Sequence, residues 1–84
     1  MMDRPTEEQV FEVVKGKILE VLDVPPANIR KEASLRDLGA NSLDRVEVVS
    51  LSMQALSLRF RVSELAKVSN IGELVQALHQ KLDG

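Results

Sequence analysis

The chain has 84 residues, no cysteine, and a formal net charge of −2 with its basic residues scattered along the sequence. This length allows one small domain, so we expect residues 1–84 to form a single unit with one core. The lack of cysteine excludes disulfides, thiol catalysis and cysteine metal sites, and the scattered charge and near absence of aromatic residues argue against a nucleic-acid partner.

The first predicted helix begins after Thr6 and ends before the prolines at positions 25 and 26. Thr6 and Gln9 fit a capping box, in which each residue bonds to the backbone N–H of the other. Two consecutive prolines cannot continue a helix. The apolar residues between these signals recur at helical spacing: Val10, Val14, Ile18, Val21 and Leu22.

Residues 27–41 show no regular period and predict a loop, with a short turn of helix at 34–38. An ordered loop of this length in a small domain is usually functional.

The second predicted helix covers residues 42–58, with Asn41 as its N-cap. Acidic residues lie in its first turns, where the helix dipole favours them. Its apolar residues occupy more than one face, which in so small a domain favours a partner-binding surface. One stripe contains Leu43, Val46, Val49, Met53 and Leu56, and Val48, Leu51 and Ala55 lie elsewhere.

The last third of the chain predicts a brief helix over residues 63–67 and a longer one that begins at Asn70. Glu73 gives this longer helix a variant of the capping box. Residues 58–62 carry a weak strand pattern. We therefore predict an all-α fold, a small four-helix bundle with three main helices, one short helix and a long loop after the first. The last helix has one apolar face: Ile71, Leu74, Val75, Leu78 and Leu82.

The N-terminal residues show no signal-peptide pattern, and no segment reaches the length needed to span a membrane. We expect a cytoplasmic, monomeric protein without membrane insertion.

Ser42 is the candidate functional residue, at the junction of the loop and the second helix. Unpaired backbone N–H groups and the positive end of the helix dipole favour an anionic group attached there. A serine at a helix start is also commonly a cap or a phosphorylation site. However, residues 38–43 match Leu-Gly-x-Asn/Asp-Ser-Leu, which arises by accident with a frequency on the order of 10⁻⁵ per position. This context favours a group carried on Ser42.

The sequence predicts no catalytic or metal site. The only histidine, His79, lies near the end of the last helix, where a cation is favoured electrostatically. Ser42 has no identifiable base to activate it as a nucleophile. Asp37, Asp44 and Glu47 could be read as magnesium ligands. They lack the spacing of an EF-hand loop, so solvated or partner-facing charges are the preferred interpretation.

The motif and the order of the elements together resemble the acyl carrier proteins. Residues 37–47 resemble that family's prosthetic-group attachment motif, and residues 68–71 resemble the entry into its last helix. The resemblance implies a bundle of acyl-carrier type and a non-catalytic function. It further implies that a magnesium-dependent phosphopantetheinyl transferase moves 4′-phosphopantetheine from coenzyme A to Ser42. The thiol of this arm would hold acyl chains as thioesters for acyltransferases, ketosynthases or related enzymes.

The resemblance also implies a partner-recognition surface on the second helix. Its acidic side chains would steer basic partners and its aliphatic side chains would anchor them. Carried over by position, this surface contains Leu43, Asp44, Arg45, Val46, Glu47 and, further along, Met53.

Two departures from the family pattern limit the kinds of pathway in which we expect this carrier to act. Asn41 stands where the family usually has Asp, and residues 50–56 lack the run of glutamates found in many fatty-acid carriers. We expect a carrier of polyketide-type secondary metabolism rather than housekeeping fatty-acid biosynthesis, with an acetyl donor for β-branching as the narrower hypothesis.

Two alternatives stay open: a peptidyl or aminoacyl carrier of the same fold, and a helical adaptor domain with Ser42 as a phosphosite. A helix-turn-helix DNA binder is disfavoured by the charge balance.

Overall fold

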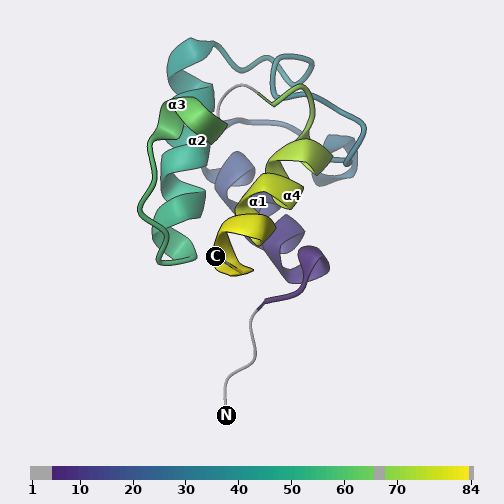
Figure 1. Cartoon of the computed structure of the whole chain (residues 1–84). Coiled ribbons are helices and arrows are strands. Elements are labelled where there is room, and N and C mark those ends of the chain that lie inside the picture. The colour runs from purple at the N-terminus through teal and green to yellow at the C-terminus, as the bar shows by residue number, and fades with distance from the viewer. Residues whose placement is uncertain (1–4, 66–67, 84) are drawn as a thin grey trace.

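The computed structural model describes residues 5–65 and 68–83, which form four α-helices and no strand. The helices are α1 (Glu7–Val21), α2 (Ser42–Ala55), α3 (Val62–Leu65) and α4 (Ile71–Asp83), and a 3₁₀ turn, η1, covers Pro26–Asn28. In Figure 1, α1 packs against both α2 and α4, and α3 joins α2 to α4. The predicted all-α bundle is confirmed. Of the described helices, none is both long enough and apolar enough to cross a bilayer.

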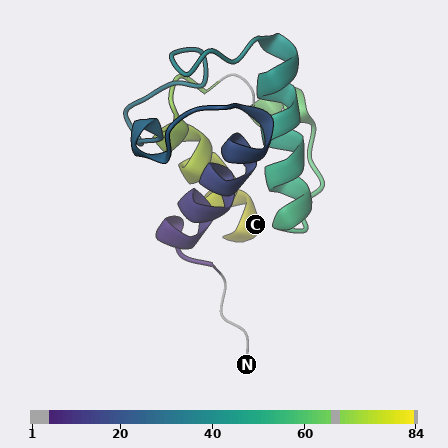
Figure 2. The same cartoon turned by 180° about the vertical axis from the view of Figure 1, so that it is seen from behind.

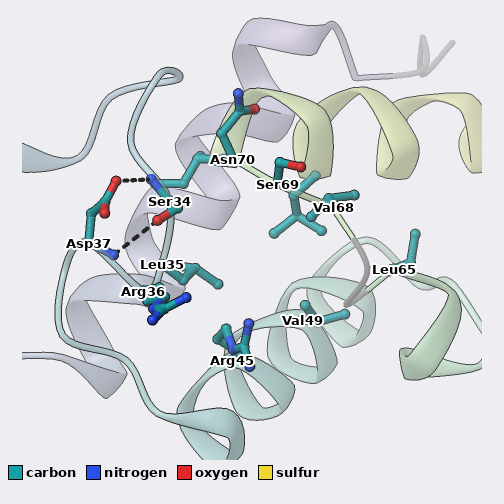
Figure 3. A pocket seen from close by; sticks show the side chains of 12 residues that line it. Ser34, Leu35, Arg36, Asp37, Arg45, Val49, Leu65, Val68, Ser69 and Asn70 are labelled. Atoms are coloured by element: carbon teal, nitrogen blue, oxygen red, sulfur yellow. Dashed lines mark hydrogen bonds between the residues drawn. The ribbon is translucent and has the colours of Figure 1, made fainter.

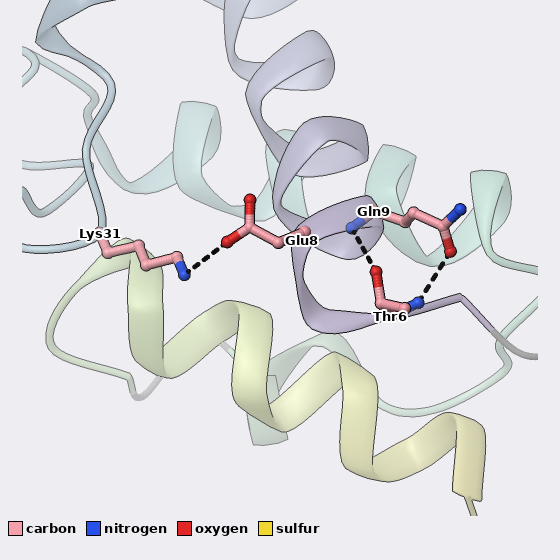
Figure 4. Close-up of polar contacts among 4 residues, drawn as sticks. All are labelled: Thr6, Glu8, Gln9 and Lys31. Atoms are coloured by element: carbon pink, nitrogen blue, oxygen red, sulfur yellow. Dashed lines mark hydrogen bonds and ion pairs between the residues drawn. The ribbon is translucent and has the colours of Figure 1, made fainter.

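The predicted capping box at the start of α1 is confirmed. The Gln9 backbone N–H donates to Thr6 Oγ1 at 3.2 Å, and the Thr6 backbone N–H donates to Gln9 Oε1 at 2.8 Å (Figure 4). From this start, the helical period carries Val10, Val14 and Ile18 onto one fully buried face. This face is the part of α1 on which the rest of the bundle packs.

The long loop between α1 and α2 crosses one end of the bundle (Figure 2) and is bonded to the start of α4. The Ile71 N–H donates to the Ala33 carbonyl and the Gly72 N–H donates to the Lys31 carbonyl, both at 2.9 Å. These bonds satisfy N–H groups that a helix start leaves unpaired. Lys31 Nζ also pairs with a carboxylate oxygen of Glu8 at 3.2 Å (Figure 4). The loop is thus held to both α1 and α4.

The core is aliphatic and draws on all four helices and on the long loop. A polar side chain, Ser52, is also fully buried, and its Oγ has no hydrogen-bond partner among the described residues. An unpaired buried hydroxyl costs free energy, because it has lost its bonds to water. The buried apolar residues are Val10, Val14, Ile18, Ile29, Leu35, Ala40, Val48, Val49, Met53, Leu65, Ile71, Leu74, Val75 and Leu78.

Helix α2 ends at Ala55, three residues before the predicted end at position 58. Ser57 adopts a φ of 58°, in the left-handed region. Its N–H donates to the Gln54 carbonyl at 3.1 Å, and the Leu58 N–H donates to the Met53 carbonyl at 2.8 Å. This pair of bonds is a Schellman motif, which closes the helix. The predicted end was wrong because a serine, rather than the usual glycine, occupies the left-handed position.

The last two helices begin close to where the sequence places them. Helix α3 corresponds to the brief helix expected over 63–67, of which residues 66 and 67 lie outside the described ranges. At the start of α4, the Glu73 N–H donates to Asn70 Oδ1 at 2.8 Å, as a capping box requires. The Glu73 side chain accepts from the Ser69 N–H, also at 2.8 Å, so the box is displaced by one residue.

Candidate functional site

Ser42 is the first residue of α2, and its side chain is exposed. The cap of this helix is Asn41, as predicted. The Asp44 N–H donates to Asn41 Oδ1 at 2.8 Å, and the Asn41 N–H donates to Asp44 Oδ2 at 3.2 Å. This reciprocal pair closes a capping box around Ser42 without using its hydroxyl. The interpretation of Ser42 as an ordinary capping residue is therefore wrong, and the hydroxyl is available for chemistry.

A single helical turn over residues 34–38, as expected from the sequence, leads the chain to Ser42. Ser34 and Asp37 cap this turn reciprocally, with the Asp37 N–H donating to Ser34 Oγ at 3.0 Å and the Ser34 N–H to Asp37 Oδ2 at 3.3 Å (Figure 3). The turn closes when the Ala40 N–H donates to the Leu35 carbonyl at 3.0 Å. Gly39 lies between them with a φ of 93°. Such a φ is costly for any residue with a Cβ, which explains the glycine of the motif.

Arg45 is the polar neighbour of the Ser42 hydroxyl. Its Nη2 lies 3.5 Å from Ser42 Oγ, one helical turn along the same face of α2. The Arg45 side chain is half-buried and does not extend freely into solvent. An arginine and a serine hydroxyl thus share one corner of the molecule, at the start of a helix.

A cavity of about 470 Å³ opens next to this corner (Figure 3). It lies between the 34–37 turn, α2, α3 and the segment that leads into α4. Its volume is in the range that holds small ligands. The buried side chains that line it are Leu35, Val49, Leu65, Ile71 and Leu74, and the exposed or half-buried ones are Ser34, Arg36, Asp37, Arg45, Val68, Ser69 and Asn70.

The exposed face of α2 next to Ser42 contains two aliphatic residues and one acidic residue. Leu43 is 79% exposed and Val46 is 45% exposed, and Glu47 is also exposed. They lie three and four residues apart, so they are neighbours on the helix surface. Aliphatic side chains exposed together beside the Ser42 hydroxyl indicate a contact surface. Asp44, expected in the same surface, is half-buried, and its carboxylate accepts a hydrogen bond from the Asn41 N–H in the cap.

Met53 does not belong to this surface, contrary to the expectation from the sequence. Its side chain is 5% exposed and lies in the core with that of Val49. The reason is the helical period. A residue advances by ~100° around the axis, so a stripe of three-residue steps drifts away from its starting face. The stripe that begins at Leu43 and Val46 on the surface therefore reaches the core at Val49.

Among the side chains that the structure describes, the other candidate residues do not assemble into a second site. His79 is half-buried in the second half of α4. Asp37 and Asp44 are each engaged in a reciprocal cap. Within residues 5–65 and 68–83, no group of three or more His, Cys, Asp or Glu side chains could hold a metal ion.

Sequence reasoning missed the cavity and the placement of Arg36 beside it. The lining comes from three parts of the chain that are separate in the sequence: residues 34–37, Arg45 with Val49, and Leu65 with residues between 68 and 74. Periodicity describes each segment alone and carries no signal for how they meet. The 3₁₀ turn η1 was also missed.

Comparison with known proteins places these features in one family. Residues 12–78 match the family described as phosphopantetheine attachment site. The polyketide biosynthesis acyl-carrier-protein AcpK of Bacillus subtilis (strain 168) is 38% identical over 77 residues, which are 90% of this chain and 94% of that protein. The acyl carrier protein of Thermotoga maritima is 35% identical over 78 residues, 92% of this chain and 96% of that protein. The acyl carrier protein of Saccharopolyspora erythraea is 36% identical over 76 residues, which are 89% of this chain and 77% of that protein. No solved structure gave a significant match.

Proposed function

Because this chain belongs to the phosphopantetheine-attachment family and is an acyl carrier protein, a non-catalytic carrier, we propose that Ser42 is its attachment residue. The observation that carries the proposal is the capping box of Asn41 and Asp44. It fixes the start of α2 without using Ser42 Oγ, which stays exposed. We further propose that residues 1–84 act as one carrier domain.

The residues around Ser42 fit a 4′-phosphopantetheine arm. The hydroxyl is exposed, a guanidinium lies beside it, and a cavity with buried aliphatic walls opens next to it. When bound, the arm supplies the thiol that holds an acyl chain as a thioester. The chain has no cysteine of its own, so no side-chain thiol competes with it.

Leu43, Val46 and Glu47 form the proposed recognition surface, called here the α2 surface. Carrier function requires the chain to meet a phosphopantetheinyl transferase with coenzyme A, and then biosynthetic enzymes. We propose that these include an acyltransferase and a ketosynthase or related enzyme. The exposed aliphatic side chains supply contact area, and Glu47 supplies charge that steers a basic partner. Asp44 and Arg45 flank this surface, and their contacts with Asn41 and Ser42 direct them toward the helix start.

The proposed pathway is of the polyketide type. Two observations support it: the similarity to a carrier named for polyketide biosynthesis, and the absence of acidic residues from positions 50–56. With few charges on the second half of α2, partner choice depends on shape and apolar contact more than on steering. Donation of acetyl units for β-branching is the narrower form of this proposal.

Intact-mass measurement tests the attachment site. We expect incubation with coenzyme A and a broad-specificity phosphopantetheinyl transferase to add one phosphopantetheine to the chain. Ser42→Ala should remain unmodified, and Ser69→Ala, which removes another exposed hydroxyl, should load normally. A wild-type chain that stays unmodified while a control carrier is loaded would contradict the proposal.

A second incubation separates the acyl carrier from an aminoacyl carrier of the same fold. The loaded chain is offered to acyltransferases with acyl-coenzyme A donors, and separately to adenylating enzymes with amino acids and ATP. We expect acyl cargo only.

A further inference from the structure

Arg45 lies at the end of α2 where a cation is least favoured. It is in the first turns of the helix, and Asp44 is the acidic residue there. The partial positive charge of a helix N-terminus repels a guanidinium. Nevertheless, the Arg45 side chain is half-buried and turned toward Ser42, with Nη2 3.5 Å from Ser42 Oγ. The acceptor of this long hydrogen bond is a neutral hydroxyl, so the contact does not compensate the charge of the guanidinium.

Among the described side chains, the surroundings of Arg45 contain both charges but no carboxylate in an ion pair with its guanidinium. Arg36 and Asp37 both line the same cavity (Figure 3), and the Asp37 carboxylate accepts from the Ser34 N–H. Asp44, adjacent in sequence, accepts from the Asn41 N–H. Among the side chains that the structure describes, the ion pairs join Lys17 to Glu20 and Lys31 to Glu8, and neither pair involves an arginine.

We propose that Arg45 is an anion-binding residue that holds the phosphodiester of the arm attached to Ser42. This inference rests on the proposed function. The non-bridging phosphate oxygens lie one bond beyond the phosphorus that Ser42 Oγ would bear, within reach of a guanidinium beside that oxygen. The planar guanidinium suits phosphate because it can donate two parallel hydrogen bonds. Arg45 also lines the cavity, so a phosphodiester held by its guanidinium would lie beside that cavity.

The same guanidinium could instead meet a carboxylate on the cargo or an acidic side chain of a partner enzyme. The observations favour the phosphodiester, because Arg45 touches the attachment oxygen itself and is turned away from full exposure. Urea unfolding of the loaded and unloaded variants separates these three anions.

The test compares the unloaded and loaded chain by urea unfolding. Intact mass first establishes that each variant carries the arm, so a failure of attachment is seen separately from a failure of Arg45 to bind phosphate. The variants are Arg45→Met, Arg45→Lys and a charge-matched control, Arg59→Met. Arg59 is exposed and lies beyond the other end of α2. The measured quantity is the difference in midpoint between the loaded and unloaded forms.

We expect loading to raise the midpoint of the wild-type chain. The rise should fall by at least half in Arg45→Met, persist in part in Arg45→Lys, and be unchanged in Arg59→Met. It should also shrink between about 0.05 M and about 0.5 M NaCl, since salt screens an exposed charge pair. An equal rise in wild type and Arg45→Met would overturn the proposal.

Two further outcomes would overturn it in favour of another anion. If Arg45→Met alters the midpoint difference only when the arm bears a carboxyacyl group, and not with an acetyl group or the free thiol, the anion is on the cargo. If Arg45→Met leaves the midpoint difference unchanged but slows transfer of the acyl group to a partner enzyme, Arg45 binds an acidic side chain of that enzyme.

Discussion

Asn41 and Asp44 cap each other across Ser42, with Asn41 Oδ1 accepting from the Asp44 N–H at 2.8 Å and Asp44 Oδ2 accepting from the Asn41 N–H at 3.2 Å. The candidate attachment residue is thus enclosed by a hydrogen-bonded loop in which it takes no part. The box holds the backbone of Ser42 in place and leaves its side chain available.

Loss of this cap should destabilise the chain. We expect Asn41→Ala to lower the free energy of unfolding by about 1 kcal/mol, since the Asp44 N–H loses its acceptor. Asn41→Asp keeps an acceptor oxygen at the same position and should retain the stability. Urea unfolding of the unloaded chain measures both. A loss of equal size in both variants would contradict the capping role.

Truncation of the α2 surface should weaken partner contact without weakening the fold. Leu43 is 79% exposed, so Leu43→Ala should change the free energy of unfolding by less than about 0.5 kcal/mol. We expect the kcat/KM for loading by a phosphopantetheinyl transferase to fall about tenfold, the equivalent of ~1.4 kcal/mol. Leu19→Ala is the matched control, because Leu19 is an exposed leucine on α1.

Glu47→Lys tests the charge of the same surface. If Glu47 steers basic partners, reversal of its charge should lower kcat/KM most at low ionic strength, because salt screens exposed charges. The measurement is the loading rate at low and high NaCl. An equal reduction at both would argue against steering.

Ser52→Ala should stabilise the chain. Ser52 Oγ is fully buried without a hydrogen-bond partner among the described residues. Its removal should raise the free energy of unfolding by about 1 kcal/mol. Ser50→Ala, on the same helix but half-buried, serves as the control and should gain only the difference in helix propensity, about 0.5 kcal/mol. Equal gains at both positions would contradict the burial argument.

Two helical glycines should respond in opposite ways to the same substitution. A Cβ on Gly16 would meet nothing within 4 Å, so Gly16→Ala should raise the free energy of unfolding by about 1 kcal/mol. A Cβ on Gly72 would lie 3.2 Å from the Lys31 carbonyl oxygen, the atom to which the Gly72 N–H donates. Gly72→Ala should therefore gain nothing or lose stability. Thermal or urea unfolding of the two variants measures the difference. An equal rise in the free energy of unfolding would show that the loop at Lys31 moves aside without cost.

Much of the fold could be predicted because its signals are local. The capping box at Thr6, the N-cap at Asn41 and the apolar period of α1 and α4 each involve residues within a few positions of one another. The end of α2 could not be predicted, since a serine takes the left-handed position and neither glycine nor proline marks it.

The candidate site also has one part that could be predicted from the sequence and one part that could not. Ser42 and the exposed neighbours Leu43 and Val46 follow from the motif and its position on a helix. The burial of Met53 and the approach of Arg36 to the cavity depend on how α2, the loop and α4 pack together. Such packing is a tertiary property, which no short window of the sequence contains.

The hydrogen bonds between the loop and α4 should protect the amide protons of Ile71 and Gly72 from exchange with solvent. First-turn amides of a helix commonly exchange with solvent quickly, because no preceding turn protects them. Here the acceptors are the carbonyls of Ala33 and Lys31, on the segment that leads to Ser42. The deuterium uptake of these two amides therefore records how often the loop lifts from the bundle, and a comparison of loaded and unloaded protein would show whether cargo closes it.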